Sequence, residues 1–67
     1  MEQVRDNFGS LICTADSGTG LMEHSYKGDT LSTTVLVGQQ FVIRRGSKTT
    51  TVVRTQEGFI ATSVMAA

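Results

Sequence analysis

Hydrophobic and polar residues alternate with a period of two along the second half of the chain. In residues 41–45, Phe41 and Ile43 fall on one face, and Val42 falls on the other face with Arg44. Residues 49–55 alternate in the same way, with threonine prominent on one side of the segment. A period of two is typical of a β-strand, and β-branched residues favour the pleated backbone.

Glycine-bearing turn signals interrupt the chain at short intervals, in DSGTG, KGD, VGQQ, RGSK and QEG. Short segments separated in this way are typical of a small all-β sandwich or barrel. A helix over residues 2–7 is the alternative for the N-terminus, although so short a helix is not stable alone. We predict about six strands, at Gly9–Thr14, Gly20–His24, Thr30–Val37, Phe41–Arg45, Thr49–Thr55 and Phe59–Val64.

Several predicted strands carry apolar residues or threonine on both faces, which a lone sheet with one solvated face does not need. Either the sheet closes on itself as a tiny barrel, or it packs against copies of itself. We therefore predict one all-β domain over residues 1–67, a small antiparallel sheet or sandwich. Its sheets are shared or packed between the subunits of a homo-oligomer, for which a ring is one arrangement.

The small size of the chain favours self-association as well. A domain of 67 residues has a small core and usually needs a disulfide, a metal or a partner subunit for stability. Cys13 is the only cysteine and His24 the only histidine, so neither an internal disulfide nor an ordinary zinc site is available. With these two means of stabilisation excluded, oligomerisation is the one that remains.

The composition also bears on the compartment. No stretch approaches the ~20 apolar residues of a membrane span, and the polar N-terminal residues lack the apolar centre of a signal peptide. A lone cysteine fits a reducing environment. We expect a cytoplasmic protein that does not contact a membrane.

No catalytic signature emerges from the sequence. Cys13 lies among apolar neighbours and is interpreted as a small buried hydrophobe, and His24 as a surface histidine on a strand. Asp16 and Asp29 stand at turns, where aspartate serves the backbone. We therefore expect no enzyme, no cofactor and no metal.

The basic residues cluster in RRGSKTTTVVR. This segment holds four of the six lysines and arginines of a chain with no net charge: Arg44, Arg45, Lys48 and Arg54. One interpretation is a solvated hairpin tip whose charges protect a strand edge. The other is a site for an anion or a nucleic acid, formed by converging cations and the N–H groups of a glycine turn. Repetition in an oligomer would multiply the phosphate contacts.

The order of several short motifs resembles the tryptophan RNA-binding attenuation protein family. KGDT (Lys27–Thr30) is followed by Gly38 and Gln39 opening a strand, then by RRGSKTT, by TVVRT and by GFIATS. The resemblance implies a ring of antiparallel sheets shared between neighbouring subunits. It also implies an amino-acid ligand held between two loops at each junction, and single-stranded RNA on the rim.

Carried over to this chain, the resemblance assigns one side of the ligand cleft to Gly28, Asp29 and Thr30. It assigns the other side to Thr49 and Thr50. Arg54 matches the arginine of the rim motif, whereas the motif's lysine is replaced by Val52.

We therefore predict a non-enzymatic, homo-oligomeric β binding protein whose partners are its own copies, a small amino-acid-like ligand and single-stranded RNA. Two alternatives stay open. One is a small protein–protein interaction, inhibitor or accessory module of a phage or mobile element. The other is a structural subunit of a larger assembly.

Overall fold

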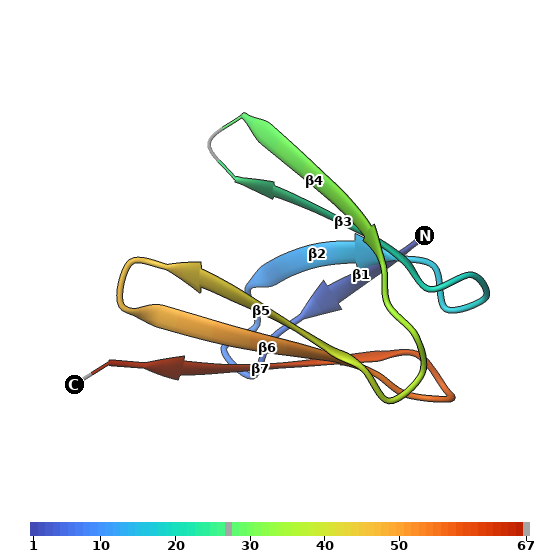
Figure 1. Ribbon diagram of the computed structural model, residues 1–67. Helices are drawn as coiled ribbons and strands as arrows, with labels where there is room; N and C mark the ends of the chain where they lie inside the picture. The colour runs from blue at the N-terminus through green and yellow to red at the C-terminus, as the bar shows by residue number, and fades with distance from the viewer. Residues whose placement is uncertain (27, 67) are drawn as a thin grey trace.

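A computed structural model describes residues 1–26 and 28–66, and the chain folds as two antiparallel sheets (Figure 1). No helix occurs among these residues, so the all-β prediction is confirmed. The strands are β1 (Glu2–Arg5), β2 (Leu11–Ala15), β3 (Leu21–Tyr26), β4 (Asp29–Thr34), β5 (Gln40–Arg45), β6 (Lys48–Arg54) and β7 (Phe59–Met65).

Within each sheet, every strand pairs with its neighbour in sequence, whereas β4 and β5 lie in different sheets. The first sheet has the order β1-β2-β3-β4 and the second the order β5-β6-β7. In the second sheet, Ile43 lies opposite Thr50 and Thr50 opposite Ser63, and all three are buried. Their sequence neighbours face outward, so the predicted period-two alternation of these strands is confirmed.

The N-terminal segment is a strand, so the helix considered for residues 2–7 is wrong. Val4 of β1 lies opposite Cys13 of β2, and both side chains are buried. Pairing with β2 satisfies the backbone groups of a segment too short to form a stable helix. With only one buried apolar position, β1 leaves no periodic signal in the sequence.

The core lies between the two sheets. The first sheet contributes five buried side chains, those of Val4, Ile12, Cys13, Ala15 and Met22. The second sheet contributes Ile43, Val52 and Ala61, while Phe41 and Phe59 pack against the cluster. Met22 and Val52 are its largest fully buried side chains, which confirms that the core of this chain is small.

The β3–β4 hairpin projects away from the rest of the molecule (Figure 1). β4 ends at Thr34, three residues earlier than predicted. The chain leaves the strand where Val35 turns into the core, and the Leu36 and Val37 side chains that follow are exposed. Of the six residues of β4, only Thr33 is partly buried.

Arg54 fixes the connection between the two sheets. Its Nη1 donates to the carbonyl oxygen of Val35 at 2.8 Å, and its Nη2 donates to that of Ser17 at 3.2 Å. Gly20 lies beside this contact, with a φ of 83° and with its own carbonyl accepting from the Val35 N–H at 2.9 Å. A β6 side chain thus holds the β2–β3 turn and the end of β4 in place.

Candidate functional site

The predicted basic surface is divided between two faces of the β5–β6 hairpin. Gly46 and Ser47 form the turn, and Arg45 lies opposite Lys48. Arg44 is exposed on the outer face of the sheet and makes none of the hydrogen bonds or ion pairs found among the described residues. Arg45, Lys48 and Arg54 are partly buried on the inner face. The structure therefore does not gather the four cations on one surface of a single copy.

Arg45 reaches from β5 to the projecting hairpin. Its Nη2 lies 2.9 Å from Nδ1 of His24 and donates to the carbonyl oxygen of Ser25 at 3.1 Å. Because a guanidinium can only donate, Nδ1 of His24 is the acceptor. His24 is a partly exposed histidine on strand β3, and the contact with Arg45 links it to the second sheet, which the sequence did not indicate.

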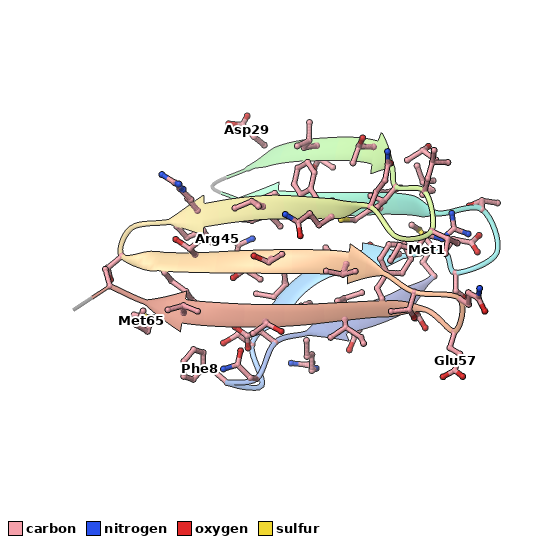
Figure 2. All side chains as sticks on the ribbon, turned by 60° about the horizontal axis from the view of Figure 1, so that its bottom comes forward. Met1, Phe8, Asp29, Arg45, Glu57 and Met65 are labelled. Carbon is pink, nitrogen blue, oxygen red and sulfur yellow. The ribbon has the colours of Figure 1, made fainter. Side chains whose placement is uncertain are left out.

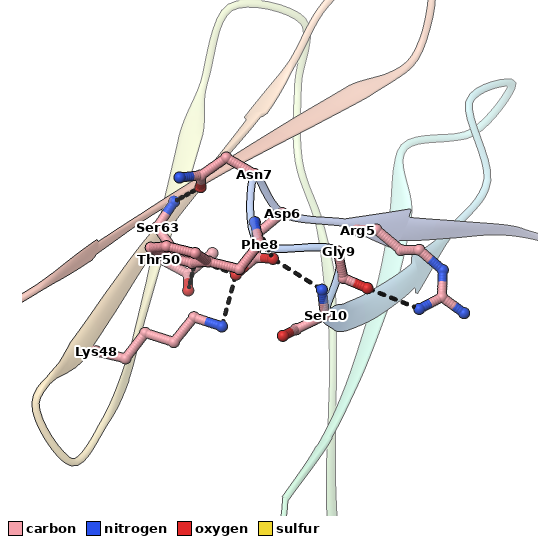
Figure 3. Close-up of polar contacts among 9 residues, drawn as sticks. All are labelled: Arg5, Asp6, Asn7, Phe8, Gly9, Ser10, Lys48, Thr50 and Ser63. Carbon is pink, nitrogen blue, oxygen red and sulfur yellow. Dashed lines mark hydrogen bonds and ion pairs between the residues drawn. The ribbon is translucent and has the colours of Figure 1, made fainter.

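Lys48 belongs to a polar cluster beneath the second sheet (Figure 3). Its Nζ lies 2.6 Å from Oδ2 of Asp6, and the carboxylate of Asp6 is fully buried. The ammonium also lies 5.3 Å from the centre of the Phe8 ring. This ion pair joins the β1–β2 loop to β6, so it is a structural contact between the sheets.

Asp6 is the centre of this cluster. Its Oδ2 accepts from the hydroxyl of Ser63, and its Oδ1 accepts from the backbone N–H groups of Phe8 and Ser10 at 3.0 and 2.9 Å. Burial alone would raise the pKa of Asp6. The hydrogen bonds from Lys48, Ser63 and the two backbone groups outweigh burial and hold the pKa of Asp6 well below its usual range.

Two further contacts complete the polar cluster. The Oγ1 of Thr50 and the Oγ of Ser63 are 2.6 Å apart, and the backbone N–H of Ser63 donates to Oδ1 of Asn7 at 2.6 Å. Thr50 and Ser63 are each only 3% exposed. Since no substrate can reach hydroxyls buried in this way, the Ser–Asp–Lys arrangement serves packing rather than nucleophilic catalysis.

The residues predicted to bind a small ligand separate into two groups in one copy. Gly28, Asp29 and Thr30 are exposed where β4 begins, and Asp29 lies at the outer end of the hairpin (Figure 2). Thr49 faces outward on β6, whereas Thr50 is buried. The first group comes from one sheet and the second group from the other. Lys27, in the same predicted loop, lies outside the described residues.

Two surface hollows border the projecting hairpin. A depression of about 330 Å³ is lined by His24, Asp29, Thr30 and Leu31, so it includes two of the predicted ligand residues. A cleft of about 180 Å³ opens where β2 and β3 part, because these strands pair only at Thr14–Glu23 and Ala15–Met22. The cleft is lined by residues 11–14 of β2 together with Glu23, Ser25 and Arg45.

Cys13 at the wall of this cleft is not poised for reaction. Burial raises the pKa of the Cys13 thiol to about 11, although the positive charge of Arg45 opposes the shift. A thiol with so high a pKa holds almost no thiolate at neutral pH, and the thiolate is the nucleophile. The interpretation of Cys13 as a small buried hydrophobe is therefore confirmed.

The outer face of the second sheet is a regular surface with one charged residue. Its side chains form three rows across β5, β6 and β7, which follow from the strand register. Val42, Ile60 and Val64 are 46%, 58% and 65% exposed. Arg44 is the only charged member of this array, which we call the outer face: Gln40–Val53–Ile60, Val42–Thr51–Thr62 and Arg44–Thr49–Val64.

Such a composition is unusual for a solvated sheet face. An antiparallel sheet with one wet face normally places polar and charged residues there. Four of the nine residues of the outer face are apolar and three are threonine, and exposed apolar groups gathered on one face are typical of interaction surfaces. The sequence contained this signal, because Val42, Ile60 and Val64 all occupy outward positions of confirmed alternation.

Asp6 is the buried charged group that sequence reasoning missed. Nothing near Asp6 in the sequence points to a buried carboxylate, because its partners Lys48 and Ser63 come from distant strands. Asp16 was interpreted correctly, since its Oδ1 accepts from the N–H of Gly18 at 2.8 Å within a turn.

Neither a metal centre nor a membrane-spanning helix is found in the part of the chain that the structure describes. No group of three or more histidine, cysteine, aspartate or glutamate side chains is placed to hold a metal ion there. Nor do residues 1–26 and 28–66 contain a helix long and apolar enough to cross a membrane. Comparison of the chain with protein-family models, with curated proteins and with solved structures finds no match.

Proposed function

We propose that this chain is a non-enzymatic binding protein that works as an assembly of identical copies. The observation that carries the proposal is the outer face, where exposed or partly exposed valine, isoleucine and threonine side chains occupy seven of the nine positions. The partner that fits the outer face best is the outer face of a second copy of this chain. A face with one charge and a flat array of β-branched side chains packs well against an identical face, as in sandwiches of stacked sheets.

The small core supports the same proposal. Met22 and Val52 are the only large side chains that are fully buried among the described residues. Covering Val42, Ile60 and Val64 would add to the buried apolar surface at roughly 25 cal/mol per Å². Association would therefore supply stability that one copy does not obtain from its own interior.

Ile60→Lys with Val64→Lys is expected to weaken self-association by about a hundredfold, because each copy loses two apolar contacts and gains two charges at the packed face. Sedimentation velocity or native mass spectrometry of wild type and variant would measure the change. Leu36→Lys is the matched control, since Leu36 is 59% exposed and Ile60 58%, but Leu36 lies in the β4–β5 loop. A wild-type chain that stays monomeric up to ~200 µM contradicts the proposal.

The ligand and RNA components of the expected function extend this proposal. The depression beside Asp29 and Thr30 lies on the β3–β4 hairpin, outside the packed outer face, so it is the part of the predicted ligand cleft that an assembly leaves open, whereas Thr49 lies on the packed face. Arg44 is the basic residue of the segment best placed to contact phosphate, since it lies exposed on the edge strand β5, at the border of the outer face, where a packed second copy leaves it accessible. Repeated once per copy, Arg44 would provide the several phosphate contacts that nucleic-acid affinity requires.

Arg44→Ala is expected to lower the affinity for a labelled single-stranded RNA about three- to tenfold and to reduce its salt dependence. Fluorescence anisotropy at two or more salt concentrations would measure both effects. Arg5→Ala is the control, because Arg5 is also exposed but lies on β1 and donates to the Gly9 carbonyl. Equal affinities of wild type and Arg44→Ala, or no RNA binding at all, would remove RNA from the proposed function.

A further inference from the structure

The outer face is too small to hold two copies together tightly by itself. Three strands and three residues along each strand cover roughly 300 Å² per copy, from the usual strand spacing and rise. A stable specific interface typically buries about 800 Å² per partner. If the chain works as an assembly, a second contact surface is required.

β4 has an unpaired edge that fits this need. Among the described strands, β3 is its only neighbour, so the other side of β4 carries no strand. The N–H of Val35 donates to the carbonyl oxygen of Gly20, which directly precedes β3, so the backbone groups of Val35 point toward the β3 side. This fixes the direction of the backbone groups along β4. In an antiparallel ladder these groups alternate in direction. The N–H and C=O groups of Thr30, Ser32 and Thr34 therefore point outward.

The edge of β4 has few of the devices by which natural edge strands avoid pairing. Those devices are charged side chains, above all lysine, together with proline, bulges and covering segments, and in β4 only Asp29, at the first residue, is charged. β4 reads DTLSTT and pairs with β3 in an uninterrupted register of six residues. β1 is short, carries Arg5 at a register shift and packs beside β7, and β5 carries Arg44 and Arg45.

We propose that β4 pairs with β4 of a second copy, antiparallel about a twofold axis at Ser32. This inference rests on the proposed function, that copies of the chain associate, and it names the surface. Pairing would join the two β1-β2-β3-β4 sheets into one continuous sheet across the dimer. Because the hairpin projects from the body of the molecule, the edge is open to a second hairpin (Figure 1).

The proposed register follows from the outward groups. Ser32 of one copy faces Ser32 of the other, and Thr30 faces Thr34 in both directions. These three pairs use every outward N–H and C=O of β4, forming about six hydrogen bonds. A shift by two residues in either direction moves one end of the pairing beyond the strand, to Gly28 or to Leu36. The twofold register is thus the one with the greatest overlap.

The side chains are compatible with this register. Thr–Thr and Ser–Ser pairs across strands are favourable, whereas like charges directly opposite are not. Asp29, the only charged residue of β4, falls opposite Val35 of the other copy, so the two aspartates lie at opposite ends of the interface. No like charges meet along the paired strands.

Two double variants test the register. Thr30→Lys with Thr34→Glu places lysine opposite glutamate twice, whereas Thr30→Lys with Thr34→Lys places lysine opposite lysine twice. Thr30 and Thr34 are exposed, and their β3 neighbours Ser25 and Leu21 are uncharged, so both variants are expected to fold alike. Circular dichroism and the melting temperature at a concentration below association would verify that expectation.

Sedimentation equilibrium would measure association of the wild type and of both variants at low salt. We expect the lysine–glutamate variant to associate at least as tightly as the wild type, and the lysine–lysine variant at least tenfold more weakly. Equal association of the two variants, whether strong or weak, overturns the proposed pairing. If the wild type and both variants associate with the same affinity, the β4 interface alone is overturned and the proposed function stands. A strictly monomeric wild type overturns the proposed function as well.

Discussion

Gly20→Ala is expected to destabilise the protein by about 2–5 kcal/mol, which is most of the stability that a domain of this size holds. Two costs add. Gly20 has a φ of 83°, and a left-handed conformation costs an L-residue roughly 1–2 kcal/mol. In addition, a Cβ at this position would clash with the carbonyl oxygen of Val35 and the guanidinium of Arg54. The clash adds about 1–3 kcal/mol, because overpacking forces neighbours to move.

The backbone oxygen of Val35 cannot move aside without breaking the link between the sheets, since it accepts the hydrogen bond from Arg54. Urea unfolding followed by circular dichroism would measure the loss. Gly46→Ala is the matched control: Gly46 has a φ of 61° but has no atom within 4 Å of the added methyl position. We expect Gly46→Ala to cost about 1 kcal/mol. Equal losses at the two glycines would contradict the role assigned to the Val35–Arg54 contact.

Asp6→Asn is expected to produce the second large effect, a fall in melting temperature of about 10 °C or more at neutral pH. The substitution leaves the ammonium of Lys48 without its carboxylate and removes the acceptor of the Ser63 hydroxyl. Asp16→Asn is the control, because Asp16 accepts one local hydrogen bond in an exposed turn and asparagine suits such a turn. A scan by differential scanning calorimetry would compare the variants, and a similar small fall for both would contradict the importance of the cluster.

The same carboxylate makes stability depend on pH. The pKa of Asp6 is lower in the folded chain than its value of 3.8 in an unfolded chain. Its contribution is therefore complete above about pH 4 and is lost progressively as the pH falls further, because the unfolded state then binds the proton more readily. Unfolding free energies measured from pH 6 to pH 2 should fall more steeply in wild type than in Asp6→Asn. Parallel curves would contradict this assignment.

The strands were predicted most accurately where the residues on both faces of the strand show the features of β-structure. Residues 40–64 combine β-branched residues, period-two alternation and glycine turns, and β5, β6 and β7 lie within one or two residues of their predicted bounds. β1 escaped prediction because only Val4 is buried in it. β4 was predicted too long because Val35 and Val37 continue its alternation, although the chain has already turned toward the second sheet.

The candidate site was harder to predict, because its groups are assembled by the packing of the sheets. Arg54 shares a face with Val52, which is fully buried, so the alternation already placed it toward the interior. Clustering along the sequence grouped Arg54 with Arg44 as candidate anion contacts and left open whether they share one surface. Where strands alternate, neighbouring charges in sequence diverge in space.

The two proposed contacts lead to a particular kind of assembly. The outer face and the β4 edge each match an identical partner, so each forms an interface with twofold symmetry. Two such interfaces on one subunit close into a tetramer with dihedral symmetry when their axes intersect at right angles, and extend as a filament when the axes do not intersect. The ring implied by the family resemblance needs head-to-tail contacts instead, so the mass and symmetry of the assembly distinguish these arrangements.

Because all paired strands are consecutive in sequence, each ladder of hydrogen bonds can form by extension from a short hairpin loop. Few residues need to be closed into a loop before the first bonds form, and such local connectivity favours rapid folding. The polar contacts that join the two sheets are made by four side chains whose partners are far away in the sequence, those of Asp6, Arg45, Lys48 and Arg54. The transition state for folding is therefore expected to lie at the docking of two preformed halves.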